Sequence, residues 1–274
     1  MSIVPPQSLH YRVLGAQTSA AKAPLVLLHG LMGFAANWGK VWPFFDRERL
    51  VLAFDQRGHG RSEKPNHGYA PEDYARDLKT LLDELGWTRA HIVGHSMGGR
   101  VALAFAHGHP SYCISLTMED SGAGPRPDRS NWIRGLLGGI PTPFPDREEA
   151  KRFFSESFQG DPLTAGFLHA NLETKPGGSL DWRFHAPGMI ETVEKGRCLD
   201  AFPQFRSIVA PTLLVRGERS VEFPQNEAEE MAGARKNVEL VVIPGAGHFV
   251  HAEAPKPFSE ALASFIARVE NGAS

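Results

Sequence analysis

Cysteine and long apolar runs are both scarce in this chain of 274 residues. Only Cys113 and Cys198 occur, and two thiols so far apart exclude a disulfide-rich scaffold and favour a reducing compartment. No uninterrupted apolar stretch approaches the roughly 18 residues that a membrane helix needs. The N-terminal residues show no basic segment followed by an apolar one, so no signal peptide is expected. We therefore predict a cytoplasmic protein with no membrane partner.

A strong net charge of either sign is also lacking. The formal net charge is −2, and no run of lysine and arginine occurs. Without a local basic cluster there is no electrostatic case for a nucleic-acid partner. The composition, with 42% hydrophobic residues, is ordinary for a globular protein. The length suits one large α/β domain or a domain with a modest insertion.

Apolar runs bounded by Gly, Pro or Asp recur along the chain and are typical of strands that are buried on both faces. The clearest runs are 24–30, 50–55, 90–94, 113–120, 212–217 and 238–245. Helical patterns lie between or after them, at 71–86, 98–110 and 255–271. Alternation of this kind predicts an α/β fold with a mostly parallel central sheet and helices on both faces.

The alternation breaks once, between about Ser121 and Phe205. This segment lacks a buried-strand run and carries many aromatic side chains, which an irregular surface loop would leave exposed. The aromatic residues are Trp132, Phe144, Phe153, Phe154, Phe158, Phe167, Trp182 and Phe184. We predict a core domain of residues 1–120 and 206–274, with residues 121–205 inserted as a helical cap, or lid, over the ligand end of the sheet.

The most specific motif is Gly94-His95-Ser96-Met97-Gly98, which fits G-x-S-x-G. It directly follows a predicted strand and opens a predicted helix, which is the context that a nucleophile elbow requires. A sharp strand-to-helix turn exposes the Ser96 hydroxyl at the end of the sheet, while the glycines let neighbouring backbone pass close by. The helix N-terminus also brings backbone N–H groups near a developing negative charge.

Two further loops fit the same chemistry. The strand ending in His29-Gly30 leads into a loop in which the backbone N–H of Leu31 is an expected oxyanion donor, beside that of Met97. His248 follows the last predicted strand in a Gly-rich loop and precedes the final helix, where a general base can reach the serine hydroxyl.

Other polar residues are expected to have structural roles. His29 is expected to be an orienting, hydrogen-bonded residue, and Asp55, Arg57 and His59 in DQRGHGRS (55–62) to hold a tight loop. His251 is expected to be exposed or to form a local hydrogen bond. No cluster of His and Asp has the spacing of metal ligands, so no metal site is expected.

Four segments, HGLMG, DQRGHGRS, GHSMGG and GAGHFVHAEAP, stand in the order found in α/β-hydrolases, and the chain resembles this family over its whole length. The resemblance implies Ser96 as nucleophile, His248 as base, and an oxyanion hole formed by Leu31 and Met97. It implies neither a metal nor an organic cofactor. A serine at the elbow argues against haloalkane dehalogenases and epoxide hydrolases, in which an aspartate is expected there. The expected partner is a small-molecule ester substrate, and a monomer or homodimer is expected.

The acid of the triad is not at its usual place. The familiar pattern after the strand 212–217 is Gly, two variable residues and Asp, but the third residue after Gly217 is Ser220. Successive side chains of a strand alternate in direction, so only one of two neighbouring carboxylates at a strand end is expected to face the site. Four carboxylates are candidates: Glu218, Glu222, Glu119 and Asp120.

Asp120 is the preferred candidate, because it ends the strand 113–120 and keeps the order Ser96, Asp120, His248. A branch of the family, the small YbfF-like bacterial esterases, carries its acid after this earlier strand and has Ser in the later loop. The segment GSLDWRFH (178–185) also resembles the Trp-Arg-Phe pattern of that branch. The three glutamates stay open as alternatives.

The residues and the resemblance predict a serine carboxylesterase that hydrolyses small to medium acyl esters, or thioesters, through an acyl-enzyme intermediate. The aromatic residues of the cap suggest an apolar pocket. Cofactor-free perhydrolases and C–C bond hydrolases carry similar elbows and are the enzymatic alternatives. A hydrolase-fold small-molecule receptor is a third hypothesis, disfavoured because each catalytic element is present.

Overall fold

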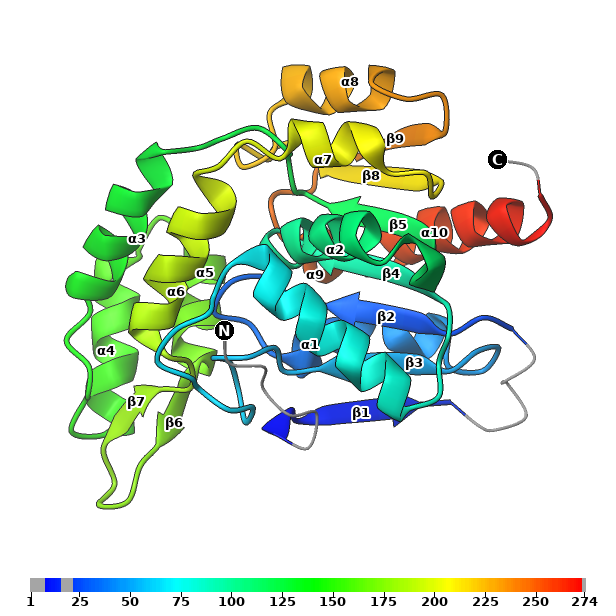
Figure 1. Ribbon diagram of the computed structural model, residues 1–274. Helices are drawn as coiled ribbons and strands as arrows, with labels where there is room; N and C mark the ends of the chain where they lie inside the picture. The colour runs from blue at the N-terminus through cyan, green and yellow to red at the C-terminus, as the bar shows by residue number, and fades with distance from the viewer. Residues whose placement is uncertain (1–7, 16–21, 273–274) are drawn as a thin grey trace.

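The computed structural model describes residues 8–15 and 22–272, which form a central seven-stranded sheet (Figure 1). The strand order is β1-β3-β2-β4-β5-β8-β9, with β1 antiparallel to β3 and the other neighbours parallel. The strands are β1 (Tyr11–Leu14), β2 (Leu25–Leu28), β3 (Val51–Phe54), β4 (Ala90–His95), β5 (Cys113–Glu119), β8 (Thr212–Gly217) and β9 (Val238–Ile243). The predicted α/β class with a mostly parallel sheet is confirmed.

The two edge strands are where the sequence pattern was least informative. All residues of β2, β3, β4 and β8 are buried, as continuous apolar runs predict. In β9 only Ile243 is buried, so the prediction of a strand buried on both faces is wrong there. β1 has three exposed residues out of four and no apolar run, which is why the sequence pattern did not predict it.

Helices cover both faces of the sheet, as predicted (Figure 1). On one face lie α1 (Pro71–Glu84), α2 (Met97–Gly108) and α8 (Gln225–Gly233), and on the other α9 (Val250–Glu253) and α10 (Pro255–Glu270). Proline at the first position of α1 suits the fixed φ of a helix start, and Gly86 follows its end with a positive φ. None of the helices in the described ranges is both long and apolar enough to cross a bilayer.

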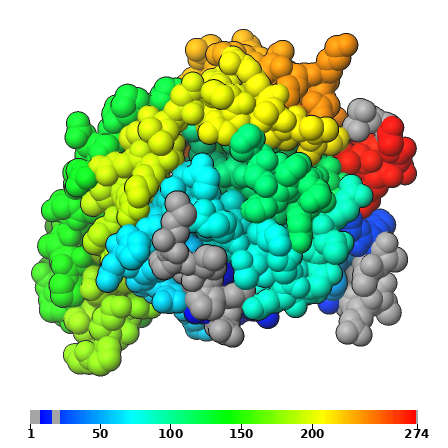
Figure 2. All heavy atoms as spheres, in the orientation of Figure 1, coloured from blue at the N-terminus to red at the C-terminus, as the bar shows by residue number. Residues whose placement is uncertain are grey.

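Between β5 and β8 the chain leaves the sheet and forms a separate group of elements at one side of the molecule (Figures 1 and 2). The prediction of an all-helical segment missed a short antiparallel hairpin, because strands of three residues leave no periodic signal. The elements of this group are α3 (Asp128–Gly138), α4 (Arg147–Ser157), α5 (Pro162–Ala170), β6 (Leu172–Thr174), β7 (Leu180–Trp182) and α6 (Ala186–Thr192), which a π-helical turn, Val193–Arg197, follows. The next helix, α7 (Phe202–Ser207), lies beside α8 over the sheet (Figure 1). Division of the chain into a core domain and a cap at residues 121–205 stays a prediction, and we call these residues the cap segment.

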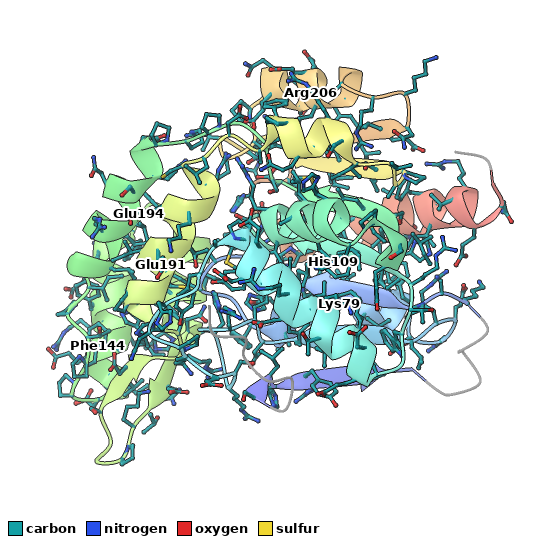
Figure 3. The ribbon with its side chains drawn as sticks, viewed as in Figure 1. Lys79, His109, Phe144, Glu191, Glu194 and Arg206 are labelled. Atoms are coloured by element: carbon teal, nitrogen blue, oxygen red, sulfur yellow. The ribbon has the colours of Figure 1, made fainter. Side chains whose placement is uncertain are left out.

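Hydrogen bonds tie the cap segment to the rest of the chain at several points, one of them at Glu191 of α6, which is labelled in Figure 3. Glu191 accepts hydrogen bonds from the backbone N–H groups of Gly68 and Tyr69, each at 3.3 Å. Arg100 of α2 donates to the carbonyl oxygens of Gly124 and Leu199, one in each connection between the cap segment and the sheet. Burial lowers the pKa of Arg100 to about 9, so it stays charged at neutral pH. A single buried guanidinium group therefore holds both connections against the helix that starts at the G-x-S-x-G motif.

Candidate active site

Ser96 occupies the sharp turn between β4 and α2. Its backbone has φ 52° and ψ −114°, a conformation that a non-glycine residue adopts only under strain. Two glycines make the turn possible: a Cβ on Gly94 would lie 2.0 Å from the carbonyl oxygen of Gly98, and one on Gly98 would lie 2.3 Å from that of Leu28. The G-x-S-x-G spacing therefore follows from the close approach of backbone at both sides of the serine.

The loop after β2 lies directly against this turn. Because Gly98 packs on the carbonyl oxygens of Leu28 and His29, the end of β2 and the start of α2 are held side by side. Leu31 and Met97 both line the cavity into which Ser96 opens. Met97 is the first residue of α2, where backbone N–H groups have no partner within the helix.

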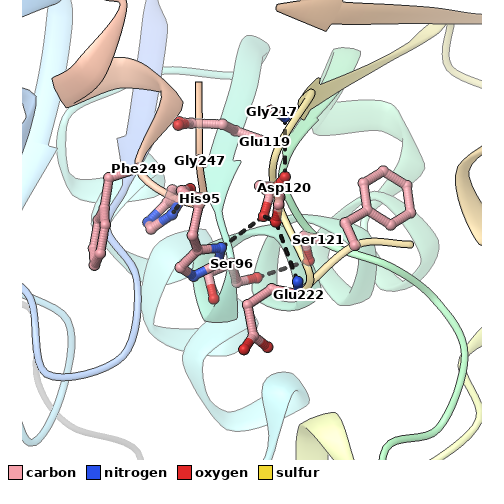
Figure 4. Close-up of polar contacts among 12 residues, drawn as sticks. His95, Ser96, Glu119, Asp120, Ser121, Gly217, Glu222, Gly247 and Phe249 are labelled. Atoms are coloured by element: carbon pink, nitrogen blue, oxygen red, sulfur yellow. Dashed lines mark hydrogen bonds and ion pairs between the residues drawn. The ribbon is translucent and has the colours of Figure 1, made fainter. Parts of the chain in front are cut away.

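Asp120, which is labelled amid the dashed contacts of Figure 4, is brought together with His248 although 128 residues separate them in the chain. Oδ2 of Asp120 accepts a hydrogen bond from Nδ1 of His248 at 2.6 Å. The same carboxylate accepts from the N–H of Gly217 at 3.1 Å and from the hydroxyl of Ser220. Asp120 is only 1% exposed, and its buried carboxylate accepts hydrogen bonds from these three donors. His248 belongs to a segment that we call the histidine loop (residues 245–251).

Ser220 has a more specific role than its sequence position suggested. It stands where the familiar pattern places the acid, and its hydroxyl donates to Asp120, which comes from the neighbouring strand. Gly217 also contributes, because a Cβ there would lie 2.0 Å from the carbonyl oxygen of Gly247 in the histidine loop. The end of β8 thus supports an acid that β5 supplies.

The three glutamates considered as alternatives point elsewhere. Glu218 is exposed and accepts from the N–H of Gly245 at 2.7 Å. Glu222 forms an ion pair with Arg129 of α3 at the wall of the cavity. Glu119 is completely buried and accepts hydrogen bonds from His251. None of the contacts found for them in the described part of the chain involves the ring of His248.

The expected structural role of the segment 55–62 is confirmed. Asp55 accepts from the N–H groups of Ala35 and Arg61 at 2.8 and 2.9 Å, so it fixes two loops at once. Arg57 forms a fully buried ion pair with Asp77 of α1. His59 accepts from the N–H of Met32 at 3.2 Å.

His29 has the orienting role that was expected. Its Nε2 accepts from the N–H of Gln56 at 3.0 Å, and its Nδ1 lies 2.8 Å from the carbonyl oxygen of Gly30. Burial lowers the pKa of both His29 and His59, which favours neutral rings with the proton on Nδ1. Neither ring is therefore a charged group in the site.

A cavity of about 590 Å³ lies over Ser96, between the sheet and the cap segment, and its volume is typical of small-molecule sites. Ser96, His248, Leu31 and Met97 line it together with mostly apolar side chains. Of the cap aromatics, Trp132, Phe158 and Phe167 line the cavity, whereas Phe144, Phe154, Trp182 and Phe184 are buried in the core. Trp132, Leu163 and Val221 are 44%, 47% and 75% exposed, so the wall also presents apolar side chains to solvent.

A second polar cluster, His95, Glu119 and His251, lies beside the histidine loop. The three residues come from separate segments, and their potential ligand atoms lie within 4.8 Å of one another, which sequence spacing could not reveal. Glu119 accepts from the N–H of His251 at 2.7 Å and from its Nδ1 at 2.8 Å. Both of these bonds go to Oε1 of Glu119. The prediction that His251 is exposed or bonded locally is wrong, because it is buried and its partner lies 132 residues away.

Comparisons with known proteins place the chain among hydrolases. A family model described as the alpha/beta hydrolase fold matches residues 23–255. A 2-(acetamidomethylene)succinate hydrolase from Mesorhizobium japonicum is 28% identical over 89% of this chain and 88% of its own length. The sn-1-specific diacylglycerol lipase ABHD11 of Mus musculus is 30% identical over 96% of this chain and 86% of its own.

Solved structures are similar over nearly the whole chain. The crystal structure of an E-2-(acetamidomethylene)succinate hydrolase covers 94% of this chain and 95% of its own, with a TM-score of 0.82 and 26% identity. A marine microorganism esterase covers 94% of this chain and 98% of its own, with a TM-score of 0.81 and 27% identity.

Proposed function

The chain belongs to the alpha/beta hydrolase family, and from this premise we propose that it is a serine carboxylesterase that hydrolyses small to medium acyl esters. Ser96, His248 and Asp120 form the proposed triad. The single observation that carries the proposal is the 2.6 Å hydrogen bond between Asp120 and His248 beside the strained Ser96 turn. Two similar proteins, a diacylglycerol lipase and an esterase, are named for cleavage of esters.

The proposed reaction begins at Ser96. In neutral His248 the ring proton lies on Nδ1, which donates a hydrogen bond to Asp120. Nε2 therefore carries no proton and can accept the proton of the serine hydroxyl. Oγ of Ser96 then forms a bond to the ester carbonyl carbon, and the carbonyl oxygen becomes an oxyanion. The N–H groups of Leu31 and Met97 are the proposed donors to that oxyanion.

The second half of the reaction returns the enzyme to its starting state. The protonated His248 gives its proton to the alcohol oxygen as the bond from that oxygen to the carbonyl carbon breaks, which leaves an acyl group on Ser96. Water then loses a proton to His248 and attacks the acyl carbon, and the carboxylic acid leaves as the serine recovers its proton. Asp120 stays ionised throughout and stabilises the imidazolium ion.

The cavity supports an apolar substrate group. Its volume of about 590 Å³ accommodates a small ligand, and Trp132, Phe158 and Phe167 give it aromatic walls. A thioester with the same acyl group would react through the same steps. No organic cofactor is part of the proposal, and the proposed partner is the ester itself.

A series of p-nitrophenyl esters of increasing acyl length tests the proposed function. We expect turnover for short and medium chains, loss of turnover after treatment with a serine-directed phosphonate, and no turnover by the Ser96→Ala variant. The control is the Ser155→Ala variant, which changes a serine of α4 whose hydroxyl donates to a carbonyl one turn earlier in its own helix. If the wild-type protein hydrolyses no ester at any length, the proposal is wrong.

A further inference from the structure

Two consecutive carboxylates at the end of β5 hold two residues of the same histidine loop. Asp120 accepts from the ring of His248, and Glu119 accepts from both the backbone and the ring of His251. Glu119 is the last residue of β5, whereas Asp120 follows the strand with a positive φ of 47°, so the chain turns between the two carboxylates. Only Asp120 contacts the ring of His248, as expected, and Glu119 instead holds a second residue of the same loop.

The contacts of Glu119 are short and fully enclosed. Oε1 lies 2.7 Å from the backbone nitrogen and 2.8 Å from Nδ1 of His251, and Oε2 lies 3.1 Å from the same Nδ1. Glu119 is 0% exposed and His251 is 4% exposed. A buried N–H group that loses its acceptor lowers stability by about 1–3 kcal/mol. A conformation in which the loop moves away from this carboxylate is therefore unfavourable.

Two further contacts hold the backbone around His248. His95, the residue before the serine, places Nε2 3.0 Å from the carbonyl oxygen of His248. Its ring centre lies 4.7 Å from that of His248 and 4.8 Å from that of His251. Burial lowers the pKa of His95 well below its usual range, so the ring is neutral and donates from Nε2. Glu253 accepts from the N–H of Gly247 at 2.9 Å.

We propose that Glu119 is a positioning residue, which fixes the main chain of the histidine loop so that the ring of His248 stays on Asp120. The loop needs such a support because Gly245 and Gly247 precede the histidine and restrict the chain least of all residues. The inference rests on the proposed function, since it assigns Glu119 a part in the same reaction. Glu119 does not touch the reacting atoms, and its effect is transmitted through His251.

Kinetics of Glu119→Met and Glu119→Gln test the proposal. Methionine has a similar shape but no acceptor, whereas glutamine keeps an oxygen for the N–H of His251. We expect Glu119→Met to lower kcat by about 10–100-fold through misplacement of His248, with KM changed less than about twofold. Glu119→Gln should stay within about threefold of the wild type, because one anchor remains. Glu218→Gln, an exposed carboxylate that also bonds to this loop, is the matched control.

The split between kcat and KM separates positioning from a general loss of stability. If Glu119→Met gives a folded protein whose kcat equals that of the wild type, the proposal is overturned. If that variant does not fold, His251→Asn replaces it, with an expected loss in kcat of about tenfold at unchanged KM. Wild-type kcat in this second variant also overturns the proposal.

Hydrogen exchange at the backbone N–H of His251 tests the role of Glu119 without measuring catalysis. We expect protection in the wild-type protein and faster exchange in Glu119→Met, because the acceptor at 2.7 Å is removed. A wild-type protein without ester turnover would refute the proposed function, but the exchange result would still show whether Glu119 holds the loop. Equal exchange in both proteins overturns the inference about Glu119.

Discussion

Replacement of Asp120 by asparagine is the change that bears most directly on the proposed triad. The carboxylate accepts from Gly217, Ser220 and His248, and an amide has only one oxygen for these three donors. With its NH₂ group directed at His248, the amide would require Nδ1 to be the acceptor. The ring proton would then lie on Nε2, where the proton of Ser96 has to be received.

The expected loss follows from this change of tautomer. In a serine protease triad, the same acid-to-amide change lowers kcat about 10⁴-fold. At about 1.4 kcal/mol for each factor of ten, this is about 5.5 kcal/mol of transition-state stabilisation. We expect a loss of about 10³–10⁴-fold in Asp120→Asn, measured as kcat for a p-nitrophenyl ester, with a melting temperature that shows a folded protein.

Matched variants make the result decisive. Glu218→Gln and Glu222→Gln change the carboxylates that follow β8, and both should keep kcat within about threefold, because neither contacts His248. Ser220→Asp added to Asp120→Asn should recover at least about tenfold, because residue 220 already reaches the oxygen that His248 contacts. The assignment of the acid is refuted if Asp120→Asn is nearly as active as the wild type while Glu218→Gln or Glu222→Gln loses activity.

Three further predictions concern the scaffold around the site. Gly98→Ala should lower the free energy of unfolding by about 1–3 kcal/mol and also lower kcat, because the new Cβ would lie 2.3 Å from the carbonyl oxygen of Leu28. An unchanged melting temperature together with an unchanged kcat would contradict this. Burial lowers the pKa of His91 to about 4, against 6.5 in the unfolded chain. The neutral ring therefore contributes its full share to the free energy of unfolding above pH 6.5, and this share is lost as the pH falls towards 4. His91→Asn should therefore reduce the difference in unfolding free energy between pH 7.5 and pH 5 by about 1–2 kcal/mol, and an unchanged difference would contradict the stated cause. Arg57→Met should lower the free energy of unfolding by about 3–5 kcal/mol, because Asp77 loses its buried ion-pair partner, and a loss below about 1 kcal/mol in a urea titration would count against that role.

The sequence was informative wherever a local pattern determines the structure. Buried parallel strands leave continuous apolar runs, and the turn at Ser96 needs glycine on both sides, so the sheet and the G-x-S-x-G turn could be predicted. Asp120 could be proposed because the usual position after Gly217 is occupied by a serine. Its 2.6 Å contact with His248 is consistent with that proposal.

Contacts between distant segments left no local signal. The bond from Ser220 to Asp120 joins two strand ends 100 residues apart, and a serine in a loop is ordinary in a sequence. The same is true of Glu119, at the end of β5, and His251, in α9, which are 132 residues apart in the chain. Exposure of β9 depends on its place at the edge of the sheet, which apolar periodicity does not determine. Strand order and tertiary contacts are therefore what the structure adds.

A structure of the protein with a phosphonate covalently bound to Ser96 tests the central claim most directly. The account predicts that phosphorus is bonded to Oγ of Ser96 and that one phosphoryl oxygen accepts from the N–H groups of Leu31 and Met97. It also predicts that Nδ1 of His248 remains on Asp120. A phosphonate bonded to another side chain, or a His248 ring paired with Glu218 or Glu222, would contradict the account.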